Sequence, residues 1–397
     1  MTAVLARRAV KAAAVVRAAA TAKAVAVAIR RSDVTIRGGL RAALFVAAAI
    51  ALIVALVWVW RLTRGGGAID FYQYYAHARI AGRQYPRDLY DPMAQRELGE
   101  ELYARAVDGG SAVHIGDATL RRGLDSTATP LLYTLFGWLP KHYELGLELF
   151  RILLILAFAG GTLLLARAAR IPWTLTLLLT AALVRWFEPL HFDVWVGNVG
   201  GFQVLGLALF LAMTRRWPAA AAAILTLTIG FKPNIVPIVI LVVVTRIADR
   251  DFARLRREAI AGAAAAMCGF LASTLFYRSW DVWLDWLGAA RDFYTRLPGR
   301  EWNNIAPALP FYQRYGTDAS TWLTLPLLLI AIALVLRKRH DGLAVALGIA
   351  VYLLTAPTVW GQYLVLLVPA AFGLVMAMQK NDGRRAHTRR PPVLRGL

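Results

Sequence analysis

Long uninterrupted runs of apolar residues constrain this chain more than any other feature. The first clear run, RAALFVAAAIALIVALVWVW (41–60), spans about twenty residues and ends in tryptophans suited to a membrane interface. As a helix it would cross a hydrocarbon core of about 30 Å. Hydrophobic residues make up 58% of the 397 residues and charged residues only 17%, against about 25% in soluble proteins. The sequence therefore predicts an all-α, polytopic helical membrane protein.

About ten transmembrane helices are expected. Besides the first, they lie near 145–166, 172–187, 198–213, 218–230, 234–248, 259–277, 322–337, 342–356 and 363–378. The segment TATPLLYTLFGWLP (127–140) is too short for a comfortable crossing, so we expect a re-entrant or interfacial helix there. Residues 91–110 are amphipathic and predict another interfacial helix, whereas 108–126 has the composition of a polar loop.

The charges between these spans predict an orientation. Connections at 167–170, 214–217, 246–258 and 337–340, together with the tail, are rich in Lys and Arg and fall on one side. The opposite side receives 61–127 and 278–320, in which Arg and acidic residues balance. By the positive-inside rule the basic side is cytoplasmic, so the long loop carrying Asp70 faces outward. The net charge of +21 then indicates anchoring on anionic lipid rather than nucleic-acid binding.

Three regions follow from this reading. Residues 1–40 form a basic cytoplasmic arm, 41–378 a transmembrane domain with an outer loop at 61–144, and 379–397 a basic cytoplasmic tail. The Ala- and Arg-rich composition hints at a bacterium, so the expected location is a bacterial plasma membrane, with multiple crossings. The single cysteine, Cys268, excludes a disulfide or a cysteine metal site within the chain.

Four motifs occur in order on the predicted outer face. They are DFYQYYAHARIAGRQYPRDLYDP from residue 70, TPLLYTLFGWLP, GFKPNIVPIVI and LTAPTVWGQYLVLLVP. Together they cover about 70–370 and resemble glycosyltransferase family 87, which belongs to the GT-C superfamily of polyprenyl-phosphate-sugar transferases. In the last motif the family often has His where this chain has Gln362. A neutral amide can bond a sugar or phosphate but cannot carry charge or move a proton.

The resemblance implies a GT-C-type fold and a set of site residues. Inverting transfer from a polyprenyl monophosphate needs a base near the acceptor hydroxyl and a group that neutralises the departing phosphate. Asp70 is the expected general base and Lys232 the expected phosphate ligand, with Arg79 as a second candidate for the phosphate. Aromatic faces and amides suited to sugar binding are expected from Tyr74, Tyr75, Asn198, Asn303, Trp360, Gln362 and Tyr363.

The same reading predicts no cofactor and no obligatory metal, because the outer loops contain no Asp-x-Asp pair of nucleotide-sugar type. Family resemblance alone favours mannose as the sugar and arabinofuranose next, with a glycan or glycolipid as acceptor. A transporter or flippase for a lipid-linked sugar is the alternative from another class, although the polar residues crowd the outer half of the membrane. A noncatalytic partner in envelope assembly is a third possibility, which Gln362 leaves open.

Overall fold

The computed structural model describes residues 38–80, 89–124, 128–295, 304–316 and 319–388. This part of the chain is helical throughout and contains no strand. Its α-helices and short 3-10 helices (η) are, in chain order, α2 (Gly38–Thr63), α3 (Ile69–Ile80), α4 (Pro92–Gly109), α5 (Ala112–Leu120), α6 (Pro130–Phe136), α7 (Tyr143–Ala168), α8 (Trp173–Trp186), α9 (Glu188–Val196), α10 (Gly200–Met213), α11 (Pro218–Phe231), η2 (Pro233–Ile235), α12 (Val236–Ala248), α13 (Phe252–Tyr277), α14 (Val282–Thr295), α15 (Leu309–Tyr315), α16 (Ser320–Lys338), α17 (Asp341–Thr355), η4 (Gly361–Leu366) and α18 (Leu367–Thr388).

Every one of the ten predicted spans coincides with a helix. Five stretches in the described part are long and apolar enough to cross a membrane: Arg41–Thr63, Tyr143–Ala168, Phe252–Tyr277, Ser320–Lys338 and Gly361–Gln379. A sixth is possible if α9 and α10, which meet at a bend of 120°, act as one broken span. The remaining apolar helices have 10–17 residues. At about 1.5 Å per residue these reach only part of the way across a 30 Å core. The protein is thus an all-α, multi-pass membrane protein.

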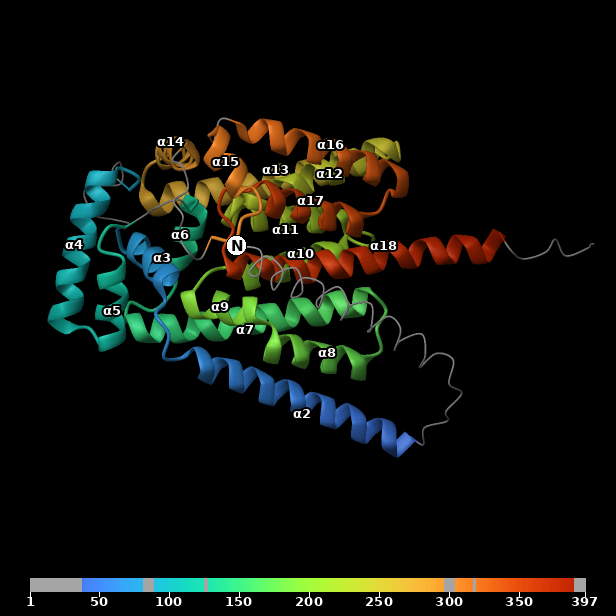
Figure 1. Cartoon of the computed structure of the whole chain (residues 1–397), viewed down its shortest axis with the longest axis horizontal. Helices are drawn as coiled ribbons and strands as arrows, with labels where there is room; N and C mark the ends of the chain where they lie inside the picture. The colour runs from blue at the N-terminus through green and yellow to red at the C-terminus, as the bar shows by residue number, and fades with distance from the viewer. Residues whose placement is uncertain (1–37, 81–88, 125–127, 296–303, 317–318, 389–397) are drawn as a thin grey trace, which may run out of the picture.

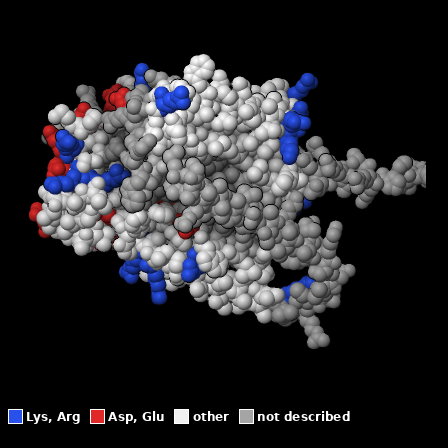
Figure 2. Space-filling view, in the orientation of Figure 1, with Lys and Arg blue, Asp and Glu red and all other residues white. Residues whose placement is uncertain are grey.

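The long helices run roughly parallel to one another, and helices α3 to α6 gather at one end of them (Figure 1). At that end Asp and Glu side chains accompany Lys and Arg, whereas the visible charges at the other end are Lys and Arg (Figure 2). The helix α18 continues past 378 to Thr388, so the predicted tail begins as a helical extension. Of the basic arm, only residues 38–40 lie within the described part.

Both short segments predicted to be helical, 91–110 and 127–140, contain a helix. Helix α4 occupies most of 91–110, and the Asp91 carboxylate caps it by accepting from the amides of Met93 and Ala94. Helix α6 has only seven residues and is about 10 Å long, so it cannot span the membrane. It packs instead against α3 and α13.

The prediction of a polar loop at 108–126 is wrong, because residues 112–120 form helix α5. The Ser111 hydroxyl caps this helix by accepting from the His114 amide. Asp117, on the inner face of α5, is 1% exposed and accepts from the Ala68 amide at 2.8 Å and from the Tyr143 hydroxyl at 2.6 Å. A buried carboxylate with two donors fixes this helix against α3 and α7, so the polar composition serves packing rather than a loop.

A second buried polar cluster ties helices together at the opposite end from α4 and α5. The Arg246 guanidinium, on α12, pairs with Glu258 of α13 at 2.9 Å and with Asp341 of α17 at 2.6 Å. Arg254 joins the same carboxylates, at 2.8 Å and 3.7 Å. Because each buried charge has a partner of opposite sign, the cluster fixes the relative positions of three helices.

Candidate active site

Asp70 lies in the first turn of α3 and is 5% exposed. Its Oδ2 accepts from the Asn198 Nδ2 at 2.7 Å, and its Oδ1 lies 3.4 Å from an Arg121 guanidinium nitrogen. Carboxylate oxygens have about four lone-pair sites, so capacity remains for a further donor such as an acceptor hydroxyl. A carboxylate at a helix N-terminus is also favoured by the helix dipole.

Asn198 connects Asp70 to the cation that the sequence predicted. Its Oδ1 accepts from the Val199 amide at 2.7 Å and from the Lys232 Nζ at 3.3 Å. The residue lies at the bend between α9 and α10, next to Gly197, which has φ of +74°. A Cβ at Gly197 would come within 2.4 Å of the Phe71 Cβ, so the bend requires glycine there and brings Asn198 against α3.

Lys232 is placed by a break in the chain. It follows α11 with extended backbone angles, φ −153° and ψ 108°, and precedes Pro233. A residue before proline is disfavoured from helical geometry, so the Lys-Pro sequence ends the helix at this point. The Lys232 Nζ lies 3.9 Å from the centre of the Tyr363 ring, a cation–π distance. Asp70, Asn198, Lys232 and Tyr363 therefore meet at one place although they are far apart in sequence.

Asp193 is a neighbouring acid that sequence reasoning missed. It is fully buried on α9, and its carboxylate accepts from the backbone amides of Gly200 and Gly201, at 3.2 Å and 2.8 Å. These bonds hold the start of α10 and so hold Asn198 between the two helices. The only signal in the sequence was an acid inside an apolar segment, which is costly and usually marks function or pairing.

The other predicted aromatic and amide residues fall into two groups: one lies near Tyr363 and Asp70, and the other faces the opposite side of α3. Tyr74 and Gln362 are buried at 7% and 5% exposure, and Trp360 stacks on Tyr363 with ring centres 6.2 Å apart. Burial, and then the negative charge of Asp70, raises the pKa of Tyr74 well above its usual value, so its hydroxyl stays protonated. Asn303 lies outside the described residues.

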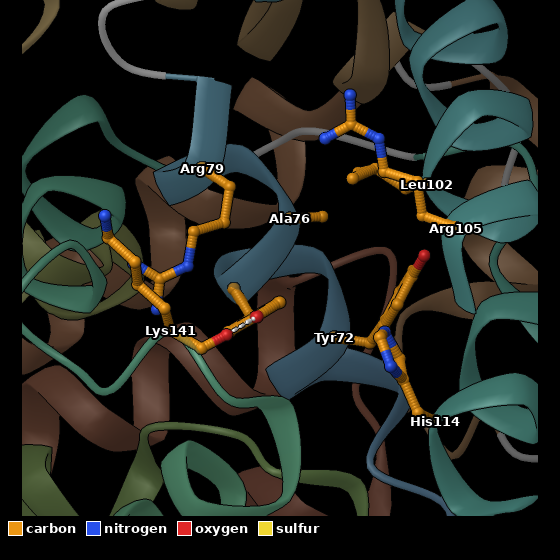
Figure 3. Close-up of a pocket in the computed structure, with 8 residues that line it drawn as sticks. Tyr72, Ala76, Arg79, Leu102, Arg105, His114 and Lys141 are labelled. Carbon is orange, nitrogen blue, oxygen red and sulfur yellow. Dashed lines mark hydrogen bonds between the residues drawn. The ribbon is translucent and has the colours of Figure 1, made fainter. Parts of the chain in front are cut away.

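Tyr75 and Arg79 lie on the opposite face of α3 from Asp70 and Tyr74, as helical spacing requires. The Arg79 guanidinium donates to the Leu139 and Pro140 carbonyls at 3.0 Å and 2.6 Å, and lies 4.6 Å from the centre of the Tyr75 ring. Both residues line a cavity of about 450 Å³ between α3, α4 and α5 (Figure 3). The structure therefore separates these two predicted residues from the Asp70 group, which consists of Asp70, Asn198, Lys232 and Tyr363.

Within the described ranges no three His, Cys, Asp or Glu side chains come together in a way that could hold a metal ion. The chemistry of the Asp70 group is that of a carboxylate, an amide and an ammonium close to one another. Such a set can accept a proton on one side and stabilise an anion on the other.

Comparison with known protein families matches residues 128–366 to glycosyltransferase family 87. The match covers more than half of the chain and contains Asn198, Lys232 and Tyr363. It begins after Asp70, which the fold brings into contact with Asn198. No curated protein and no solved structure matches the chain.

Proposed function

The chain belongs to glycosyltransferase family 87, and on that premise we propose that it transfers a sugar from a polyprenyl monophosphate to a glycan or glycolipid, with inversion and with Asp70 as general base. Mannose is the sugar we propose first and arabinofuranose second, both from family resemblance. Membership of a glycosyltransferase family makes the chain a transferase, which favours the enzyme over the flippase considered from sequence.

The observation that carries this proposal is the hydrogen-bonded series Asp70–Asn198–Lys232. An acceptor hydroxyl must lose a proton as its oxygen attacks the sugar, and a carboxylate within about 3 Å can take it. The Asn198 amide fixes the orientation of that carboxylate through Oδ2. Oδ1, whose contact among the described residues is the longer one of 3.4 Å with Arg121, is the oxygen we assign to the proton.

Lys232 is the group we assign to the leaving phosphate. Its ammonium is half-buried next to the Tyr363 ring, and charge there is worth more than in bulk water. Since Asn198 lies between the two charged groups, an acceptor oxygen at Asp70 and a phosphate at Lys232 would be held on either side of one sugar. Trp360, Tyr74 and Gln362 are proposed to contact that sugar.

We place this chemistry on the outer face of a bacterial plasma membrane. The support is the charge distribution: the end that carries α4 and α5 has both signs of charge, and the other end is basic (Figure 2). A lipid-linked donor suits a site that ATP and nucleotide sugars do not reach. No cofactor or metal is part of the proposed reaction, and transfer should persist in excess EDTA.

The test is transfer by the purified full chain reconstituted with polyprenyl-phosphate mannose or arabinofuranose and a panel of acceptors. Asp70→Asn should reduce transfer by at least about a hundredfold, because general-base catalysis contributes roughly 10²–10⁴-fold. Asp108→Asn, an exposed acid on α4, is the matched control and should transfer normally. Normal transfer by a folded Asp70→Asn would remove Asp70 from its role, and no transfer by wild type from either donor would count against the proposed donor class.

A further inference from the structure

The cavity of about 450 Å³ beside α3 is lined by basic and hydroxyl side chains that have no part in the proposed transfer. It lies between α3, α4, α5 and the segment before α7, at the end of the molecule where helices α3 to α6 gather (Figures 1 and 3). Asp70 faces the other side of α3, and a helix with its side chains is about 10 Å thick. The cavity is therefore a second site, separate from the one at Lys232.

The charged residues among those that line this cavity are all basic. Arg79 comes from α3, Arg105 from α4 and Lys141 from the segment before α7, and the eight lining residues include no acid. Glu101 pairs with Arg105 at 2.5 Å from outside the cavity, but both side chains are about half exposed, where such pairs contribute little. The site therefore attracts an anion.

Two residues that line this cavity each carry a buried donor without a partner among the described residues, and the two side chains lie on opposite sides of α3 in Figure 3. The Tyr72 hydroxyl and the Arg79 Nε are both inaccessible to solvent and unbonded, and Tyr72 as a whole is 1% exposed. In Figure 3 the Tyr72 side chain extends toward Arg105 and Leu102, across the hollow. A buried polar group without a partner is costly, so the unpartnered Tyr72 hydroxyl indicates an acceptor that binds there.

The protonation states of the neighbouring groups suit the same kind of ligand. Burial raises the pKa of the Tyr72 hydroxyl, so this group stays a donor. Burial also lowers the pKa of His114, which stacks on Tyr143 with ring centres 4.2 Å apart. His114 is therefore neutral near pH 7, and the positive charge of the site comes from the arginines and Lys141.

We propose that this cavity binds a phosphate group that is not the donor's, recognised by Tyr72 and Arg105, with Arg79 and Lys141 adding positive charge at longer range. Phosphate oxygens accept several hydrogen bonds at once, and arginine is the side chain best matched to them. The volume has room for a phosphate together with a small attached polyol. The phosphate belongs either to a lipid headgroup or to a soluble phosphate ester, and the two sources share this chemistry.

The experiment measures binding, so it does not depend on sugar transfer. The full chain in neutral detergent is examined by native mass spectrometry for retained phosphatidylglycerol, with phosphatidylcholine as the comparison lipid. In a second arm, glycerol 3-phosphate is added and the shift in the thermal unfolding midpoint gives an apparent Kd. The variants are Tyr72→Phe, which removes one hydroxyl, and Arg105→Gln. Arg96→Gln, an exposed arginine on the same helix, makes the same change in net charge and is the control.

We expect Arg105→Gln to weaken binding by about tenfold and Tyr72→Phe by a few-fold, as loss of a hydrogen bond to a charged group predicts. Arg96→Gln should bind like wild type. Retention of phosphatidylglycerol alone assigns a lipid headgroup, and binding of glycerol 3-phosphate alone assigns a soluble ester. Binding of neither probe, or equal binding by all three variants, would overturn the proposal whether or not the protein transfers sugar.

Discussion

At the scale of single residues, the Asn198 amide donates a hydrogen bond to one charged group and accepts one from another. A carboxylate can only accept and an ammonium can only donate, so neither Asp70 nor Lys232 could do both. Its Nδ2 donates to the Asp70 carboxylate while its Oδ1 accepts from Lys232, so it lies between the two charges. A direct Asp–Lys ion pair would engage the proposed base and the proposed phosphate ligand with each other. In the proposed reaction the amide would orient both groups without pairing them with each other.

Replacing Asn198 with Ala is therefore expected to impair catalysis more than folding. Hydrogen bonds to charged groups contribute about 1.5–3 kcal/mol each, which corresponds to a roughly ten- to hundredfold lower kcat if one such bond is lost in the transition state. The measurement is kcat and KM in the reconstituted system. Gln379→Ala removes an amide that bonds the Ala169 carbonyl at the other end of the molecule and is the control. Equal kcat for the two variants would contradict the role given to Asn198.

His77 gives the protein a dependence on pH that is independent of catalysis. It is fully buried on α3, stacks on Tyr133 with ring centres 4.6 Å apart, and its Nδ1 lies 2.6 Å from the Gln73 carbonyl oxygen. Burial lowers the pKa of His77 from 6.5 to about 4. Between these two values the unfolded chain binds a proton that the folded protein does not, so acidification favours unfolding.

Wild type should therefore lose on the order of 3 kcal/mol of unfolding free energy between about pH 6.5 and about pH 4 through this residue. His77→Phe, which keeps a ring on Tyr133, should flatten this part of the dependence. Thermal unfolding in detergent across that pH range measures the effect. The exposed His142 serves as control, and His142→Gln should keep the wild-type slope. Parallel slopes for wild type and His77→Phe would show that His77 is not responsible.

At the scale of elements, helix α5 determines where α3 begins. Asp117 accepts from the amide of Ala68, just before α3, and Arg121, at the C-terminal end of α5, contacts Asp70. Both contacts are long-range in sequence. A segment that the sequence predicted as a polar loop therefore holds the proposed base in position.

Asp117→Ala should destabilise the protein by about 2–5 kcal/mol, because it leaves the Ala68 amide and the Tyr143 hydroxyl buried without an acceptor. Transfer activity should fall as well, since the start of α3 loses its anchor. Asp117→Asn keeps one acceptor oxygen and is expected to be intermediate in both respects. The exposed Asp108→Ala should change unfolding free energy by no more than about 0.5 kcal/mol. An Asp117→Ala variant as stable as Asp108→Ala would refute the anchoring role.

At the scale of the whole molecule, the two ends differ in charge and in structure (Figures 1 and 2). One end carries α4 and α5 with both signs of charge, and the other carries the basic connections and the buried Arg246 cluster. The positive-inside rule then predicts which end faces the cytoplasm. The proposed reaction depends on this orientation, because a lipid-phosphate donor serves an outer site.

Cysteine labelling in intact cells tests the orientation. With Cys268 replaced by Ser, Ser111→Cys at the start of α5 should react with an impermeant maleimide added outside. Arg216→Cys, in an exposed basic connection at the other end, should react only after permeabilisation. The reverse pattern would place α5 in the cytoplasm and would end the proposal of an outer active site.

The sequence by itself determined the properties that depend on local composition. Apolar runs and charge clusters predicted the helices and an orientation, because both follow from the membrane as solvent. The motif order predicted the family, and the Lys232–Pro233 pair predicted a helix break, because proline restricts the residue before it. A helix such as α5 was missed, because its polar composition resembles that of a loop.

Only the tertiary structure decided which of the predicted residues belong together. Asp70 and Tyr74 face one side of α3 with Asn198, Lys232 and Tyr363, whereas Tyr75 and Arg79 face a separate cavity. The physical reason is that a helix places residues four apart, such as Asp70 and Tyr74, on the same face and turns the next residue, Tyr75, toward another. The partners are set by contacts across more than a hundred positions. The role of Asp193, which holds the bend beside Asn198, can be recognised only from the tertiary contacts.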